Sequence, residues 1–116
     1  MKISMARGDL FVFPFAVFLD NEQVTAEMDE IWFTVKKHYY DEEALFQHRL
    51  TDGGIMSDGE GTYTVTIAPE DTEELAFGQY DFDIQVEKSG TLSIKRTFYG
   101  TLNLGPEVTH KGNEGA

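Results

Sequence analysis

Two runs of carboxylates are the first residues of this sequence that could do chemistry. They lie at positions 41–43, Asp-Glu-Glu, and at positions 70–74, Glu-Asp-Thr-Glu-Glu. Paired acids are what glycoside hydrolysis requires. Both runs stand beside signals for the start of a short helix, where acidic side chains stabilise the first turn. We therefore interpret them as turn-stabilising or solvated groups and expect no catalytic role.

Patterns for other catalytic or metal-binding chemistry are missing from the sequence. His38, His48 and His110 lack the i, i+2 or i, i+4 spacing that brings two imidazoles to one metal. None of the serines stands in a nucleophile-elbow pattern, and no Gly-rich phosphate loop precedes a helix. The absence of cysteine removes thiol nucleophiles, disulfides and Cys-based zinc sites. The sequence therefore predicts no enzyme, no cofactor and no metal site.

The loop from Asp52 to Gly61 is a candidate site for binding an ion. It carries Asp52, Asp58 and Glu60 among four glycines, and a bent glycine loop can aim carboxylates at calcium. The spacing does not fit an EF-hand, and turns favour Asp and Gly for conformational reasons alone. We favour a plain acidic turn, and ion binding stays an open alternative.

The tripeptide Arg7-Gly8-Asp9 is one that integrins recognise in extracellular ligands. A three-residue match arises easily by chance, and this one directly precedes a strand signal. We interpret it as a turn or bulge in which Gly8 supplies the backbone freedom.

Length and composition indicate one acidic globular domain. The chain has 116 residues, of which 41% are apolar and 26% charged. Nine basic against 21 acidic side chains give a net charge of -12, which repels phosphate backbones and anionic lipid surfaces. We therefore expect neither nucleic acid nor a membrane as a partner. The longest apolar run, residues 10–19, is too short to span a bilayer and contains Pro14, so we interpret it as neither signal nor anchor.

The elements that must position these residues are strands. A two-residue apolar period in residues 31–37, 62–67 and 80–87 predicts half-buried strands. Their inward residues are Phe33, Val35, Tyr63, Val65, Ile67, Tyr80, Phe82, Ile84 and Val86. A long, bent closing strand is expected to turn inward Leu92, Ile94, Phe98, Leu102 and Leu104, with Gly100 at a bend. Residues 10–19 are apolar at nearly every position, and Pro14 indicates an edge strand that kinks between two sheets.

Turn residues separate these strands and leave little room for helix. Ser89-Gly90 marks a hairpin between the last two strands, and residues 41–44 and 69–75 could each form one or two helical turns. About seven short strands with such turns predict an antiparallel β-sandwich of Greek-key type, with an up-and-down barrel as the alternative. The domain is expected to cover residues 1–104. Residues 105–116 lack apolar periodicity and are expected to be a flexible tail.

Four segments together carry a resemblance to a known family. They are residues 32–37 (Trp-Phe-Thr-Val-Lys-Lys), 50–55 (Leu-Thr-Asp-Gly-Gly-Ile), 67–72 (Ile-Ala-Pro-Glu-Asp-Thr) and 78–86, from Gly-Gln-Tyr to Asp-Ile-Gln-Val. In order and spacing they resemble the immunoglobulin-like domains of bacteriophage tail and baseplate proteins. The chain is similar to the N-terminal domain of baseplate upper proteins and to small stand-alone phage proteins, over about residues 3–104. It departs from the longer members by ending soon after this region.

The resemblance implies assembly rather than catalysis. The expected fold is all-β, an immunoglobulin-like antiparallel β-sandwich of about seven strands with one or two short helical turns. The expected function is that of a non-enzymatic structural or assembly protein of the tail, baseplate or neck. Its partners would be other phage structural proteins and copies of itself. It would reside in the virion after synthesis in the host bacterial cytoplasm, without a secretory signal peptide.

Aromatic residues supply the candidate interface. Nine Phe, five Tyr and one Trp are many for this length, and exposed aromatic clusters mark protein interfaces and sugar platforms. Trp32 lies on the parity opposite to its apolar neighbours, and the first apolar strand has aromatics on both parities. The candidate interface residues are Phe11, Phe13, Phe15, Phe18 and Trp32. The four phenylalanines could be buried by a neighbouring subunit or by loops of this chain, which we favour.

Two function classes follow from these features. The first is the phage structural protein that the resemblance implies. The second is a β-sandwich module that binds a carbohydrate or a peptide on its aromatic loops or on a sheet face. The identity of neighbouring genes would discriminate between them, because tail genes favour assembly and a secreted glycosidase favours the binding module.

Overall fold

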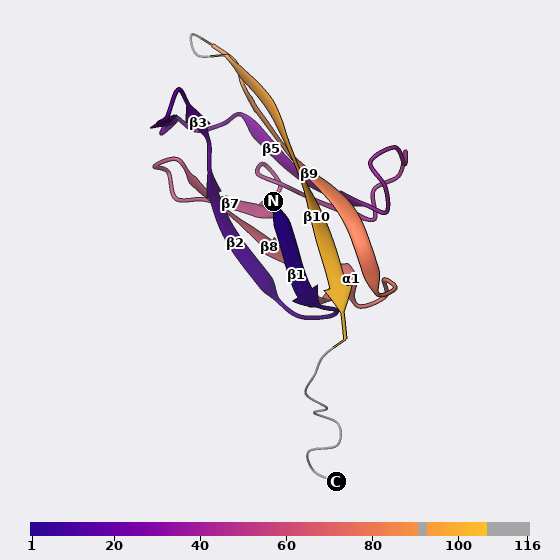
Figure 1. Cartoon of the computed structure of the whole chain (residues 1–116). Helices are drawn as coiled ribbons and strands as arrows, with labels where there is room; N and C mark the ends of the chain where they lie inside the picture. Colours follow the sequence, from indigo (N-terminus) through magenta and orange to yellow (C-terminus); the bar gives the residue numbers. More distant parts are fainter. Residues whose placement is uncertain (91–92, 107–116) are drawn as a thin grey trace.

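The computed structural model describes residues 1–90 and 93–106, which form an all-β protein (Figure 1). The large sheet has the strand order β1 (Lys2–Ala6), β10 (Ile94–Gly105), β9 (Gly78–Lys88), β5 (Glu30–Lys36) and β6 (Phe46–Arg49). The small sheet has the order β2 (Phe11–Ala16), β8 (Thr62–Ile67) and β7 (Ile55–Ser57). Both sheets are open at their edges, so the fold is sandwich-like rather than a closed barrel.

The core lies between the inner faces of the two sheets. All nine inward residues predicted from the two-residue period are buried, which confirms the period as the signal for these strands. Phe33 of the large sheet lies at the centre, with its ring 5.7 Å from that of Phe13 in the small sheet and 5.2 Å from that of Phe82. The hydroxyl of Tyr63, also buried, accepts a hydrogen bond from the backbone N–H of Met28 at 3.0 Å.

Six of the seven strand pairs in the described residues are antiparallel, as expected. The exception is β1, which runs parallel to β10 with Lys2 opposite Thr101 and Ala6 opposite Gly105. The sequence did not indicate a strand in residues 2–6, because Ile3 is the only fully buried residue in this segment. Parallel pairing of two distant segments leaves no turn signal either.

The last two strands form the long hairpin that Ser89-Gly90 predicted, with Ile94 paired to Lys88 and Leu104 to Gly78. Ile94, Leu102 and Leu104 are buried as expected, whereas Leu92 lies outside the described residues. The prediction for Phe98 is wrong, because its side chain is 37% exposed. The reason is that β1 lies beside only Thr101–Gly105, so the half of β10 that carries Phe98 has no strand on that side.

The first apolar segment is an edge strand, as Pro14 indicated. Residues 11–16 form β2 at the edge of the small sheet, and the chain then passes through the buried Val17 into β3 (Phe18–Leu19). Strand β3 pairs with β4 (Glu22–Gln23) across a tight turn in which Asp20 and Asn21 have φ angles of 51° and 67°.

The helical predictions divide. Residues 69–75 contain a short helix, α1 (Pro69–Thr72), with Pro at its start and acidic residues in its first turn. The prediction of a helical turn in residues 41–44 is wrong, because this segment is irregular and the Asp41 carboxylate instead accepts a hydrogen bond from the N–H of His38. The expected boundary at 104 falls one residue before the end of β10, and residues 107–116 lie outside the described residues.

Candidate binding surfaces

In the two acidic runs, the carboxylates of Asp41 and Asp71 accept hydrogen bonds from backbone N–H groups. Asp71 in α1 accepts hydrogen bonds from the N–H of Ala68 at 2.8 Å and from Nε2 of His48 at 2.7 Å. Thr72 is fully buried, and its hydroxyl accepts a hydrogen bond from the N–H of Gly8 at 2.9 Å. Within the described ranges, no group of three or more His, Asp or Glu side chains could hold a metal ion.

The loop from Asp52 to Gly61 contains strand β7 and two turns closed by carboxylates. One Asp52 oxygen accepts a hydrogen bond from the N–H of Gly54 at 2.8 Å. One Asp58 oxygen accepts hydrogen bonds from the N–H groups of Glu60, at 2.7 Å, and Thr62, at 3.1 Å. These two carboxylates therefore stabilise the turns by accepting hydrogen bonds from their backbone N–H groups.

The tripeptide Arg7-Gly8-Asp9 forms the turn between β1 and β2. Gly8 has a φ of 82°, and the N–H of Asp9 bonds to the carbonyl of Ala6. The guanidinium of Arg7 donates to the carbonyl of Leu75 at 3.1 Å and lies 4.1 Å from the centre of the Phe77 ring. This arginine thus ties the turn to the segment after α1 rather than reaching into solvent.

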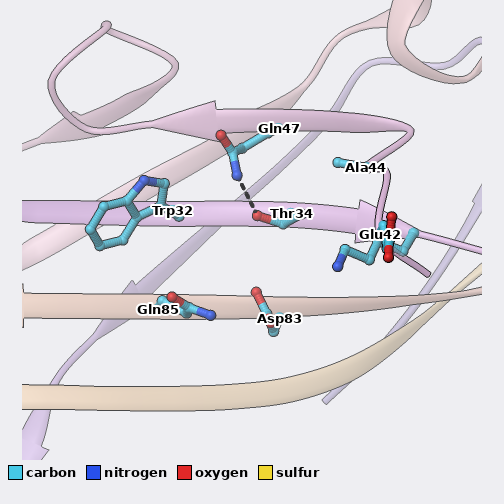
Figure 2. Close-up of a pocket in the computed structure, with 8 residues that line it drawn as sticks. Trp32, Thr34, Glu42, Ala44, Gln47, Asp83 and Gln85 are labelled. Carbon is cyan, nitrogen blue, oxygen red and sulfur yellow. Dashed lines mark hydrogen bonds between the residues drawn. The ribbon is translucent and has the colours of Figure 1, made fainter. Parts of the chain in front are cut away.

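A polar depression, which we call the Trp32 depression, lies on the outward face of the large sheet (Figure 2). It has a volume of about 310 Å³ and is lined by Trp32, Thr34, Lys36, Glu42, Ala44, Gln47, Asp83 and Gln85. The antiparallel register builds it, because Thr34 of β5 lies between Gln47 of β6 and Asp83 of β9. Figure 2 shows the Trp32 ring beside Gln85, with Gln47 directed at Thr34 and bonded to its hydroxyl at 2.8 Å.

Asp83 is the group that gives the Trp32 depression its chemistry. One of its carboxylate oxygens is buried and has no hydrogen-bond partner in the described part of the chain. Burial raises the pKa of Asp83 above its ordinary value, and the nearby Gln85 amide and Lys36 ammonium offset part of that rise. An acceptor left unpaired in this way favours a ligand that donates hydrogen bonds, such as a hydroxyl group.

An ion pair between the buried Glu30 and the partly exposed Arg49 lies beside Trp32. Arg49 of β6 lies 5.7 Å from the centre of the Trp32 ring and donates to the Glu30 carboxylate at 2.8 Å. Burial alone would raise the pKa of Glu30. Hydrogen bonds from the hydroxyl and N–H of Thr51, the N–H of Ile31 and the Arg49 guanidinium outweigh it and lower that pKa to about 2.

A second hollow, the β10 groove, is apolar and lies where β10 passes the start of the chain. Its volume is about 520 Å³, and it is lined by Met1, Phe15, Ala16, Ile84, Thr97, Phe98 and Tyr99. Three consecutive β10 residues belong to this lining, although neighbours in a strand point to opposite faces. The hollow therefore wraps around the backbone edge of β10 as well as its inner face.

The outer face of the small sheet is the third candidate surface. Its outward residues are Val12, Pro14 and Ala16 of β2, Met56 of β7, and Thr62, Thr64 and Thr66 of β8. The register aligns Pro14, Thr64 and Met56 in one row across all three strands. Val12 is 51% exposed and Met56 61%. None of these outward positions carries a charge, in a chain with 30 Lys, Arg, Asp and Glu residues.

The five predicted interface residues are not brought together on one surface. Phe11, Phe13 and Phe15 share the inner face of β2 and pack against the core, so this chain covers most of their surface. Phe18 in β3 is 54% exposed, and Trp32 lines the depression on the outward face of the large sheet.

The sequence reasoning missed both apolar surfaces. The residues of even number in the segment 10–18 are all uncharged, and this pattern could have indicated the outer face of the small sheet. Nothing local signals the β10 groove, because it depends on where β1 stops beside β10.

No family model, curated protein or solved structure matches the chain. In the described residues, none of the helical structure is long and apolar enough to cross a membrane. Function has therefore to be inferred from the three surfaces.

Proposed function

We propose that the chain is a non-enzymatic structural or assembly protein of a bacteriophage virion, in the tail, baseplate or neck. It would act as an immunoglobulin-like domain that contacts other virion proteins and copies of itself. The resemblance of residues 32–37, 50–55, 67–72 and 78–86 to phage domains supports the phage setting. The uncharged outer face of the small sheet is the observation that supports contact with proteins.

The physical argument rests on the contrast between this face and the rest of the molecule. A net charge of -12 makes most surfaces costly to bring against another acidic protein. Val12, Pro14 and Met56 are exposed and apolar, and the threonines between them are neutral, so burying this face strips no ionised group of its water. Cores of protein interfaces are depleted in charged residues in the same way.

The test is a deletion of the gene from the phage genome that encodes it, followed by complementation from a plasmid. The natural chain is expected to restore complete infectious particles and to be found in purified virions by mass spectrometry. The double variant Val12→Glu and Met56→Glu is expected to fold but not to restore particles, because it puts two charges into the contact. Thr101→Glu, on the outward face of the large sheet, is the matched control and should restore them.

Particles that are complete and infectious without the chain would contradict the proposal. So would full complementation by the double variant, provided that its circular dichroism and melting temperature match those of the natural chain.

The Trp32 depression supports a second candidate function, the binding of a carbohydrate. An indole ring beside amide and carboxylate groups can stack on the apolar face of a sugar while the polar groups bind its hydroxyls. A glycan array read with the labelled chain tests this candidate. Trp32→Ala and Asp83→Asn should each abolish any signal, and Thr101→Ala should leave it unchanged. The absence of any signal above that of Trp32→Ala would exclude the candidate.

A further inference from the structure

The β10 edge is the least complete part of the large sheet. Strand β1 pairs with Thr101–Gly105 and covers that half of β10, while residues 95–99 pair only with β9 in the part of the chain that the structure describes. Figure 1 shows the N-terminus about midway along β10, and the strand pairing leaves residues 95–99 with β9 as their partner in the described residues. An uncovered strand edge is a template for pairing with another chain.

Backbone groups along this edge point toward the empty strand position. The N–H of Thr101 donates to the carbonyl of Met1 at 3.1 Å, so Thr101 faces the β1 side of β10. The backbone N–H and C=O groups of successive residues point to opposite edges of a strand. Those of Tyr99, Thr97 and Lys95 therefore face the same side as those of Thr101. A strand lying beside residues 95–99, in line with β1, would run along these groups for roughly 16 Å at about 3.3 Å per residue.

Apolar side chains lie under the same position. Phe98 has the inward parity of β10 yet stays 37% exposed, and Phe15, Ile84 and Met1 complete an apolar floor. A strand beside β10 would direct every second side chain onto this floor, as Ile3 of β1 is buried one step further along. The site thus offers backbone pairing and an apolar pocket together, which are the two elements of recognition by strand addition.

A basic residue, Arg96, lies at the end of the exposed β10 edge that is farther from Met1, and it indicates which charge a bound strand should carry. Arg96 shares the parity of Phe98, is exposed, and lies with its guanidinium 5.7 Å from the centre of the Phe98 ring. Lys95, next to it, points to the opposite face and lies 3.9 Å from the Glu87 carboxylate, which balances part of its charge. The Arg96 guanidinium is therefore the cation that an incoming strand would meet, and it favours an acidic side chain at this end of that strand.

We propose that residues 95–99 of β10 accept an extended segment of another polypeptide as an added strand of the large sheet. The segment carries apolar side chains at alternate positions, facing Phe98, Phe15 and Ile84, and an acidic side chain at the end that lies beside Arg96. The inference deepens the proposed function by naming a kind of partner, and it rests on that function only in taking the partner to be a protein. Apart from Ala16, the residues that line this site differ from those of the outer face of the small sheet.

The experiment uses labelled synthetic peptides and the full chain. The probes are two capped peptides of about nine residues that alternate valine and threonine, a length that matches the edge. One carries two glutamates at its N-terminal end, and the other carries two glutamates at its C-terminal end. Control peptides carry glutamine for glutamate, or proline at every second position. Fluorescence anisotropy measures binding, and nuclear magnetic resonance of the amide groups locates it. One glutamate peptide is expected to bind and to shift the amide signals of residues 95–99, and the proline peptide is not.

Thr97→Pro is the decisive variant. It removes an N–H that faces the empty position and none that pairs with β9, so the hairpin should fold while affinity for the peptide falls by about tenfold or more. Thr97→Ala keeps the N–H and is the matched control, which should bind as the natural chain does. Arg96→Glu, an exposed substitution that spares the backbone, should weaken binding of the glutamate peptide but not of the glutamine peptide.

Three results would overturn the inference. The first is that no peptide binds the natural chain at millimolar concentration. The second is binding that survives both Thr97→Pro and Arg96→Glu. The third is a dimer of the chain, measured by analytical ultracentrifugation, that Thr97→Pro abolishes, because the occupant is then a second copy. The double variant Val12→Glu and Met56→Glu should bind the peptide normally, so failure of the proposed function and failure of this inference are separable.

Discussion

Glu30 shows how one carboxylate can order a surface around it. It accepts hydrogen bonds from Ile31, Arg49 and Thr51, so it joins the start of β5 to the end of β6 and to the turn that follows. Arg49 in turn lies beside the Trp32 ring. The position of Trp32 is thus set by a group that no sequence motif marks.

Glu30 should also make the stability of the protein depend on pH. Its pKa falls from 4.5 to about 2 on folding, so its contribution is fully present above pH 4.5 and is lost as pH falls toward 2. Glu30→Gln should lower the free energy of unfolding by roughly 1 to 3 kcal/mol at pH 7, because it weakens the bond to a cation. Urea unfolding of both chains between pH 7 and 2.5 measures this. A difference that stays constant over that range would contradict the assignment.

Asp83 should have the opposite effect. Burial raises its pKa, so its charged form is disfavoured in the folded chain, and stability is lost as pH rises through the folded pKa. Asp83→Asn should therefore raise the free energy of unfolding at pH 7 by up to about 1 kcal/mol. The gain should disappear in acid, where the carboxyl is neutral. Thermal unfolding at pH 7 and in acid measures the difference in stability between the two chains. Asp81→Asn on the same strand is the control. A loss of stability at pH 7 would show that the carboxylate is needed.

At the scale of strands, the two-residue apolar period predicted the buried residues wherever the two sheets pack on each other. Tyr63, Val65 and Ile67 alternate with threonines, and they are buried because β8 is the central strand of the small sheet. The same reasoning failed for Phe98, which obeys the period but lies in the half of β10 that pairs only with β9 among the described residues. Local patterns report which face of a strand is apolar. They do not report whether another element covers it.

The candidate surfaces were less predictable than the core for the same reason. The outward parity of Trp32 was visible in the sequence, and the Trp32 depression contains that residue. Its partners Gln47, Asp83 and Gln85 come from strands whose neighbours are fixed only by the sheet order. The β10 groove depends on a parallel pair between the two ends of the described chain, which no turn or period announces.

Gly100 is the residue on which this parallel pair depends. A Cβ at this position would lie 2.4 Å from Cζ of Phe82 and 2.7 Å from the carbonyl oxygen of Met1. Gly100→Ala should therefore lower the free energy of unfolding by roughly 1 to 3 kcal/mol, as overpacking does, and loosen the start of β1. Gly105→Ala, at the end of the same strand with open space around it, is the control. Hydrogen exchange at Thr101, which bonds to Met1, measures the loosening, and unchanged protection would contradict it.

At the scale of the whole molecule, charge should govern how copies of the chain meet. A net charge of -12 makes copies repel at low ionic strength, and salt screens this repulsion to a Debye length of ~8 Å at 0.15 M. Self-association should therefore be weak without salt and grow when salt is added. Sedimentation equilibrium across salt concentrations measures it.

The outer face of the small sheet should carry that association. Met56→Glu should reduce self-association at every salt concentration. Tyr40→Glu should change it little, because Tyr40 is an exposed residue of the loop between β5 and β6 in the large sheet. A dimer that forms in low salt and dissociates in high salt would mean that ion pairs, and not the neutral face, hold the copies together.

The parallel pair of β1 and β10 also decides how the protein responds to tension. Lys2 lies opposite Thr101 and Ala6 opposite Gly105, so a pull applied at Met1 and at Gly105 acts on opposite ends of two strands that lie side by side. The evenly spaced hydrogen bonds between them are then loaded together in shear rather than opened one after another. Rupture under such a load depends on the rate of unfolding rather than on equilibrium stability. We therefore expect this pair of strands to resist a pull applied between Met1 and Gly105.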